Sequence, residues 1–430
     1  MKTDILIVGA GCAGLYCALH LPQDRQIWIL TKDEITHSDS FLAQGGICML
    51  KEESDYDSYY EDTMRAGHYE NNPESVEIMI RSSGNTIQDL IDYGVDFQRE
   101  EDGSLSFTKE GGHSAKRILF HADITGREIT EKLLEQVKRR PNIKIMEYYT
   151  MVDLLCRDND CYGAVVRNPG GAIDRIYAET TVLACGGIGG LYRHTTNYRH
   201  LTGDGIAVAL KHHIALEHIN YVQIHPTTLY SDKPEERSFL ISESVRGEGA
   251  VLYNARKERF VNELLPRDVL TEKIYEQMEK DHMPYVWLSM ERIPKEELLN
   301  HFPNIVKRCR EQGYDVFREC IPVVPAQHYF MGGIKVSMSG ETSMRQLYAV
   351  GETACNGVHG KNRLASNSLL ESLVFAKRAA KKITEEKQEL KGAQFFSETA
   401  DDSRYQNKEA LEETYKQTIL NEIERLNHYV

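Results

Sequence analysis

The stretch Asp4-Ile5-Leu6-Ile7-Val8-Gly9-Ala10-Gly11-Cys12-Ala13-Gly14 decides the fold of this chain. Its four consecutive apolar residues are typical of a strand that is buried on both faces. Gly9, Gly11 and Gly14 then form the pattern G-x-G-x-x-G, and a helix is expected from residue 15 onward. Gly9 allows a tight turn, Gly11 allows the backbone to approach a pyrophosphate, and Gly14 allows close helix–strand packing. Because a helix N-terminus also attracts phosphate, the stretch predicts a dinucleotide site.

The second expected strand, residues 26–30, departs from the nicotinamide pattern at its end. In that pattern the strand ends in a carboxylate that binds the adenine-side ribose. Here Thr31 and Lys32 follow the strand instead. This difference disfavours a standard nicotinamide dehydrogenase. Lys32 is left with two interpretations, a contact with phosphate or adenine and a solvated loop lysine.

Length and composition limit the class of protein. The chain has 430 residues, enough for two or three domains, and a net charge of −14 that disfavours nucleic acid as a partner. Its nine cysteines include no C-x-x-C pair, so no metal site is expected. The chain enters its first strand almost at once, and no apolar run approaches the length of a membrane span. We therefore expect a soluble cytoplasmic protein with reduced cysteines and no membrane partner.

Two later stretches repeat the pattern of a buried strand that ends in glycine. Residues 180–187 and 346–352 both have it, and together with the first strand they indicate one sheet interrupted by an insertion. We expect helices over 55–98, 125–140 and 206–211, strands over 144–156 and 162–167, and a loop over 38–47. The predicted domains are residues 1–218 with 329–383, an inserted cap over 219–328, and a short helical C-terminal segment over 384–430. That last segment is either a helical appendage or a solvated tail.

Ten short motifs run in one order over almost all of residues 1–380, and together they resemble a known family. The family is that of the flavoproteins of succinate dehydrogenase, fumarate reductase and L-aspartate oxidase. The resemblance implies an α/β fold, in which a Rossmann-like FAD-binding domain is interrupted by an α+β capping domain. The matching stretches are Gly9–Gly14, Ala43-Gln44-Gly45-Gly46, Ala184-Cys185-Gly186-Gly187, Thr202-Gly203-Asp204-Gly205, His225-Pro226-Thr227, Arg246-Gly247-Glu248-Gly249, Pro266-Arg267-Asp268, His328-Tyr329-Phe330-Met331-Gly332-Gly333, Gly351-Glu352 and Asn362–Leu369.

The resemblance implies FAD as the cofactor. In the respiratory enzymes a histidine that links the flavin stands four residues before the alanine of A-Q-G-G, but here that position is Asp39, so non-covalent FAD is expected. Glu352 would hold the ribitol, and the helix that begins near Ser368 would direct its dipole at the isoalloxazine. Asp204 and Ser368 also have a simpler interpretation as helix caps. The full expected set of cofactor contacts is Gly9, Gly11, Cys12, Ala13, Gly14, Lys32, Ser40, Ala43, Gln44, Gly45, Gly46, Asp204, Glu352, Ser368 and Leu369.

Glu110 distinguishes members of the family. The dicarboxylate enzymes usually carry an apolar or neutral residue before the Gly-Gly pair, whereas the L-aspartate oxidases resemble this chain in carrying glutamate. Aspartate differs from succinate by an ammonium group, to which a carboxylate offers an opposite charge and an acceptor. The resemblance therefore implies that Glu110 binds the substrate amino group. The alternative is that Glu110 is a solvated loop residue, as most glutamates are, but the match to the family motif favours substrate binding.

A set of basic residues is implied to hold the substrate carboxylates between the flavin domain and the cap. Arg363 can bind a carboxylate bidentately, and Ser242 can add a hydroxyl. His225 and His328 lie at the two junctions of the insertion, although a lone histidine is more often structural. Arg267 matches the acid–base arginine of the family, although arginine is a poor general base by its pKa.

Some of these residues also have structural interpretations. Arg267 could form an ion pair with Asp268 or Glu263. Arg246 and Glu248 are expected to support the site rather than to bind substrate. These alternatives remain open from the sequence alone.

The resemblance implies oxidation of L-aspartate to iminosuccinate, with dioxygen or fumarate reoxidising the flavin. The product would feed quinolinate and NAD synthesis, with quinolinate synthase as its acceptor. The C-terminal segment is shorter than in typical relatives, so the protein could be a monomer or a homodimer. Two alternatives remain: a soluble fumarate reductase with non-covalent FAD, and a non-catalytic flavin-binding subunit.

Overall fold

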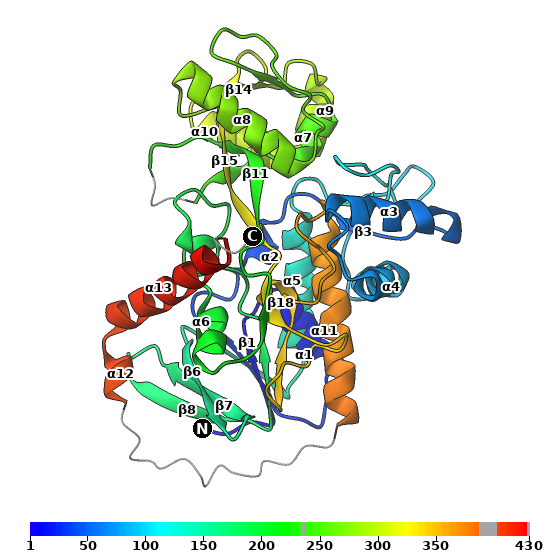
Figure 1. Ribbon diagram of the computed structural model, residues 1–430. Helices are drawn as coiled ribbons and strands as arrows, with labels where there is room; N and C mark the ends of the chain where they lie inside the picture. The colour runs from blue at the N-terminus through cyan, green and yellow to red at the C-terminus, as the bar shows by residue number, and fades with distance from the viewer. Residues whose placement is uncertain (234–236, 387–401, 428–430) are drawn as a thin grey trace.

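A five-stranded parallel sheet lies at the centre of the computed structural model, which describes residues 1–233, 237–386 and 402–427 (Figure 1). The strands predicted to share one sheet, β17, β9 and β1, are indeed neighbours in it, so that prediction is confirmed. Their glycine-rich ends consequently lie at the same edge of the sheet. In spatial order the strands are β17 (Leu347–Ala349), β9 (Thr180–Leu183), β1 (Ile5–Val8), β2 (Ile27–Thr31) and β5 (Ile143–Glu147).

Both faces of this sheet are covered by other elements. Alternate residues of β1 point to opposite sides of the sheet, so they pack into two different cores. Ile5 and Ile7 pack with helices α1 (Cys12–His20), α5 (Thr125–Lys138) and α11 (Asn367–Glu385). Leu6 and Val8 pack into a second core with α6 (Asp204–Lys211) and a three-stranded sheet. That sheet consists of β6 (Thr150–Arg157), β7 (Asp160–Arg167) and β8 (Ile173–Tyr177). The expected α/β fold is confirmed.

The inserted region forms a second sheet with its own apolar core, above the first in Figure 1. The long strands β11 and β15 run from this region down to the main body. Histidines on these two strands can therefore reach the junction between the two parts. The strands are β12 (Phe239–Leu240), β11 (Val222–Leu229), β15 (Ile321–Phe330), β14 (Val286–Ser289) and β13 (Val251–Tyr253), and the helices are α7 (Glu243–Gly247), α8 (Arg267–Asp281), α9 (Lys295–His301) and α10 (Pro303–Glu311).

Several expected elements differ in extent from those observed. The single helical region expected over 55–98 is two helices, α3 (Tyr56–Ala66) and α4 (Pro73–Asp92). The break occurs because the Asn72 side chain caps α4, and Pro73 cannot continue a preceding helix. The loop expected over 38–47 contains a short helix, α2 (Asp39–Leu42). The remaining short elements are β3 (Ile47–Cys48), β4 (Ile118–Leu119), β10 (Leu216–Glu217), β16 (Gly333–Lys335), β18 (Ala354–Cys355), η1 (Glu53–Asp55), η2 (Gly189–Leu191) and η3 (Gly351–Thr353).

The C-terminal helices α12 (Ser403–Gln406) and α13 (Lys408–Asn427) pack on the main body. Tyr405, Tyr415 and Ile419 are buried there, so the alternative of a solvated tail is wrong for these residues. Part of the predicted C-terminal segment, residues 387–401, lies outside the described residues. The boundaries proposed for the domains remain predictions. Among the described helices, none is both long and apolar enough to cross a membrane.

Candidate active site

A cavity that is partly open to solvent lies at the glycine-rich edge of the parallel sheet and extends to the inserted region. Gly9 lies in the left-handed backbone region at φ +116°, and a Cβ there would stand 1.9 Å from the carbonyl oxygen of Ala184. A Cβ on Gly14 would stand 2.2 Å from the carbonyl oxygen of Gly9. Gly14 thus packs α1 against the strand, and it is the single predicted cofactor residue that does not line the cavity.

The residues around the cavity fit FAD by their unpaired polar groups. Helix α1 begins at the cavity without a side-chain cap from Gly11, and the positive end of its dipole suits a phosphate. The N–H of its first residue, Cys12, donates to the hydroxyl of Ser40 over 3.0 Å. Buried oxygen atoms of Asp39, Gln44 and Asn197 line the cavity without a partner among the described residues. Such buried polar atoms usually have a partner, so a polar ligand is expected at this place. Burial raises the pKa of Glu352 to about 8 and that of Asp39 to about 7.

Lys32 is not a solvated loop residue. Its Nζ donates to Oδ2 of Asp204 over 2.6 Å, and both residues line the cavity. Asp204 is not the cap of α6, because the residue before the helix is Gly203 in a left-handed conformation. Ser368 is not a cap either, since Ser366 precedes α11 and Ser368 accepts a hydrogen bond from Arg363. The helix-cap alternatives are therefore wrong for both residues.

Glu110 is buried at the cavity, so its interpretation as a solvated glutamate is wrong. The hydroxyl of Ser244 donates to its Oε1 over 2.7 Å, and the hydroxyl of Ser366 donates to its Oε2 over 2.6 Å. Ser244 comes from α7 of the inserted region and Ser366 from the start of α11. The two hydroxyls fix the carboxylate where these two parts of the chain meet.

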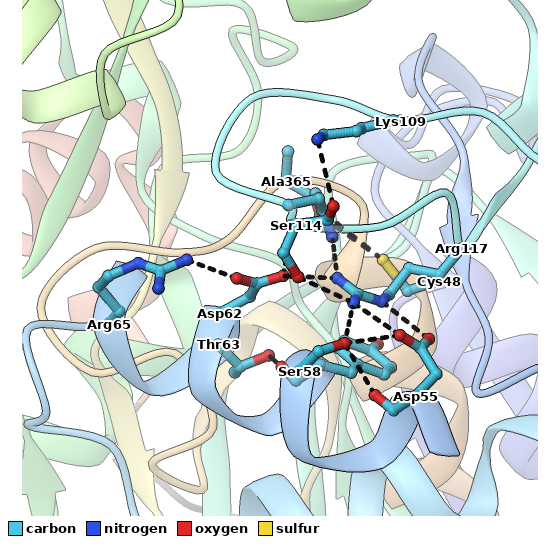
Figure 2. A network of polar contacts seen from close by, with 12 residues as sticks. Cys48, Asp55, Ser58, Asp62, Thr63, Arg65, Lys109, Ser114, Arg117 and Ala365 are labelled. Carbon is cyan, nitrogen blue, oxygen red and sulfur yellow. Dashed lines mark hydrogen bonds and ion pairs between the residues drawn. The ribbon is translucent and has the colours of Figure 1, made fainter. Parts of the chain in front are cut away.

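A buried ion-pair network holds the loop that carries Glu110 (Figure 2). Arg117, which is fully buried, donates to Asp55 over 2.9 Å and to Asp62 over 2.7 Å. The Asp62 carboxylate also accepts from the backbone N–H and the hydroxyl of Ser114. These contacts tie residues 114–117 to helix α3 and to the turn before it. Because the network is largely removed from water, its geometry constrains the loop strongly.

The rings of His225 and His328 face one another, with their centroids 5.2 Å apart. The N–H of Thr227 donates to Nδ1 of His225, and Nε2 of this ring has no partner among the described residues. Nδ1 of His328 lies 2.7 Å from the hydroxyl of Thr196. Desolvation and nearby arginine charge hold the pKa of both rings well below the usual range. The rings are consequently neutral. Nδ1 of His225 also lies 3.1 Å from the carbonyl oxygen of Thr227, so the tautomer of the ring decides whether its Nε2 is a donor or an acceptor.

Two buried arginines meet at the amide of Gln223. Nη1 of Arg267 lies 2.8 Å from Oε1 of this glutamine, and Nε of Arg363 lies 3.3 Å from the same oxygen. Nε of Arg267 also donates to Glu243 over 2.6 Å, so the alternative of an ion pair with Asp268 or Glu263 is wrong. Burial and the charge of Arg267 lower the pKa of Arg363 to about 10. The pair forms a strongly cationic patch on the cavity wall.

Other residues that were predicted to line or support the site lie around this patch. Ser242 lines the cavity and accepts the N–H of Ser244 as the cap of α7. Arg246 is fully buried and donates to the backbone of Glu263, and Glu248 pairs with His301 away from the cavity. Sequence reasoning missed the groups that orient the predicted residues, and nothing in the local sequence identifies them. They are Gln223, Glu243, Ser244, Ser366, Thr196 and Arg117.

Comparisons with known proteins agree with this geometry. Residues 4–369 match the family model described as FAD binding domain. The L-aspartate oxidase of Clostridium perfringens is 52% identical over 380 residues, covering 88% of this chain and 86% of the relative. That of Clostridium acetobutylicum is 49% identical over 384 residues, covering 89% and 88%. A solved structure of a FrdA mutant of E. coli quinol fumarate reductase matches with a TM-score of 0.84 at 28% identity, covering 98% of this chain and 74% of that chain.

Proposed function

The chain belongs to the FAD-binding-domain family, in which it groups with the L-aspartate oxidases, and from this premise we propose that it oxidises L-aspartate to iminosuccinate. The predicted FAD cofactor is confirmed by the same family match. The position of Glu110 carries the substrate assignment, because a buried carboxylate on the same cavity wall as two buried arginines suits an amino dicarboxylate better than a plain dicarboxylate.

The charged groups on the cavity wall suit this substrate. Two arginines, Arg267 and Arg363, and two glutamates, Glu110 and Glu243, are buried there, so the site presents both signs of charge. L-Aspartate carries one net negative charge at neutral pH, with two carboxylates and one ammonium group. A site of this composition offers cations to the carboxylates of the substrate and a carboxylate to its ammonium group.

We assign the substrate contacts as follows. Arg363 binds one carboxylate bidentately, and the N–H of His225 with the ring of His328 binds the other. Ser242 adds a hydroxyl to this set. Glu110 accepts a hydrogen bond from the substrate ammonium and is the nearest acceptor for its proton. These assignments are supported by the common location of all five residues on the cavity wall.

Arg267 is assigned the transfer of a proton at the substrate carbon when fumarate is reduced. Its guanidinium is held in one orientation by Glu243 and Gln223. The Glu243 carboxylate, although burial opposes its ionisation, is kept anionic because Arg267 and Arg246 lower its pKa. Glu243 thus holds the Arg267 guanidinium by an ion pair as well as by a hydrogen bond.

Bound FAD supplies an acceptor for the hydride that leaves the α-carbon of aspartate, and dioxygen or fumarate then reoxidises it. The residues expected to hold FAD are those of the α1 start, the Ala43–Gly46 loop, Glu352 and the α11 start. We further propose a cytoplasmic location, which the nine free cysteines support, and quinolinate synthase as the protein that consumes the product.

Product analysis tests this function. The purified holoenzyme is incubated with L-aspartate in air, and oxaloacetate and ammonia, the hydrolysis products of iminosuccinate, are measured in parallel. Oxaloacetate and ammonia should form in equal amounts, and the dioxygen consumed should match each of them. Reduction of fumarate without any oxidation of aspartate would instead favour a fumarate reductase. Tightly bound flavin without turnover of either substrate would favour a non-catalytic flavin-binding subunit.

A further inference from the structure

A second group of reactive side chains lies outside the cavity, where β6 approaches the end of α6. The sulfur of the half-buried Cys156 lies 3.1 Å from Nδ1 of His212, the residue directly after α6. Nε2 of the same ring lies 2.6 Å from Oδ1 of the buried Asp153. A thiol, an imidazole and a carboxylate in this order form the arrangement by which proteins activate a cysteine. None of the three residues lines the cavity described above.

The charges of this group favour an imidazolium. Burial alone would raise the pKa of Asp153, but hydrogen bonds from His212, Lys211 and Tyr405 hold it well below the usual range. The hydrogen bonds with Asp153 and Cys156 raise the pKa of His212 to about 9. The ring is therefore cationic at neutral pH and carries two N–H donors. One donor points to Asp153 and the other points to the sulfur of Cys156.

Other charged groups around the pair add to the positive potential. Nζ of Lys211 lies 2.5 Å from Asp153, and a guanidinium nitrogen of Arg404 lies 3.9 Å from it. The single buried carboxylate is thus shared among three cations, which leaves an excess of positive charge beside the sulfur. The remaining titratable groups packed around the pair are Tyr405, Tyr415 and, on β7, Asp160.

A second cysteine lies directly across the hairpin from the first. In the antiparallel pair β6–β7, Cys156 is the register partner of Cys161. The tight turn between them has positive φ at Asp158 and Asn159, which is typical of a two-residue hairpin. Directly opposed residues have Cα atoms about 4.5–5.5 Å apart and side chains on one face. This spacing lies within the range of about 4.4–6.8 Å that a disulfide spans.

We propose that Cys156 is a peroxide-sensitive thiol, activated by His212, whose oxidation product is captured by Cys161 as a cross-strand disulfide. The Cys156 thiolate attacks one oxygen of hydrogen peroxide, the O–O bond breaks, hydroxide leaves, and the sulfur becomes a sulfenic acid. The Cys161 sulfur then attacks the Cys156 sulfur. The S–O bond breaks as the S–S bond forms, and the Cys161 proton leaves with the hydroxyl as water.

The two cysteines differ in the way that this sequence of steps requires. Burial raises the pKa of the Cys161 thiol to about 11, so Cys161 stays protonated and does not compete for peroxide. Its position opposite Cys156 makes the second step intramolecular, which compensates for its low nucleophilicity. Hydrogen peroxide is the only co-reactant. The reaction therefore does not depend on which acceptor reoxidises the flavin.

Peptide mapping tests both steps. The holoenzyme is treated with a small excess of hydrogen peroxide in the presence of a dione that traps sulfenic acids, and its cysteine peptides are identified by mass spectrometry. A Cys156–Cys161 disulfide is expected in the wild type, and a dione adduct at Cys156 is expected in Cys161→Ser. Oxidation spread over other cysteines would overturn the proposal. An adduct at Cys156 in the wild type without any disulfide would overturn the role given to Cys161.

Alkylation kinetics test the role of His212. The rate of iodoacetamide labelling is measured against pH for Cys156 and for Cys320, a half-buried cysteine with no imidazole bond among the described residues. In His212→Gln, the Cys156 labelling rate at pH 7 should fall about threefold, because the sulfur loses the imidazole that activates it. Cys320 should not change. Equal labelling rates of Cys156 and Cys320 in the wild type at pH 7 would overturn the proposal even if the variant fails to fold.

Discussion

Replacement of Glu110 by glutamine separates the oxidation of aspartate from the reduction of fumarate. The substitution keeps the shape of the side chain, and the hydroxyls of Ser244 and Ser366 can rotate to suit an amide, so the fold should be preserved. What is lost is the negative charge opposite the substrate ammonium. A hydrogen bond to a charged group contributes about 1.5–3 kcal/mol. The kcat/KM for L-aspartate should therefore fall about 10- to 150-fold.

The assay compares two activities of one preparation. Fumarate has no ammonium group, so its kcat/KM in Glu110→Gln should change by less than about threefold. Glu248→Gln is the matched control, because Glu248 pairs with His301 outside the cavity, and both activities should stay at the wild-type level. Equal losses of aspartate oxidation and fumarate reduction in Glu110→Gln would refute the assignment of this carboxylate to the amino group.

Gly14→Ala places a Cβ 2.2 Å from the carbonyl oxygen of Gly9, so the affinity for FAD, measured by titration, should fall at least tenfold. The control is Gly84→Ala, at a helix position with open space around it, which should leave the affinity for FAD unchanged. Arg117→Met leaves two carboxylates without their shared cation, and the free energy of unfolding in urea should fall by about 3–5 kcal/mol; a loss below about 1 kcal/mol would contradict this account of the network. The His212–Asp153 pair should stabilise the fold most between about pH 4 and 6.5. Because the pKa of His212 is raised to about 9, roughly 1–2 kcal/mol should be lost as the pH rises from 6.5 through 9, after allowance for solvent screening. The contribution of Asp153, whose pKa is lowered, should be lost only as the pH falls below about 4, and Asp153→Asn should abolish the loss between pH 6.5 and 9.

The sequence was most informative where local patterns decide structure. Runs of apolar residues followed by glycine identified three strands that share the central sheet, because such runs are typical of strands buried on both faces. The C-terminal helix was harder to interpret. Among its described residues only Tyr415 and Ile419 are buried, so its sequence lacks the apolar stripe that distinguishes a packed helix from a solvated one.

The candidate site could be predicted residue by residue but not as an arrangement. Glu110 was singled out by its motif, yet its two hydroxyl partners lie 134 and 256 residues away, on elements that only the tertiary fold brings together. The partner of Arg267 was missed for a similar reason. Glu263 is nearer in sequence than Glu243, but Glu263 pairs with Arg259. Contacts between elements depend on packing, which local patterns do not record.

Anaerobic reduction of the purified yellow protein tests the central claim most directly. The flavin absorbance is followed after L-aspartate is added without oxygen, and succinate is added to a parallel sample. The proposed function predicts rapid bleaching by L-aspartate and little or none by succinate. Bleaching by succinate alone, or by neither compound, would contradict the assignment of this chain as an L-aspartate oxidase.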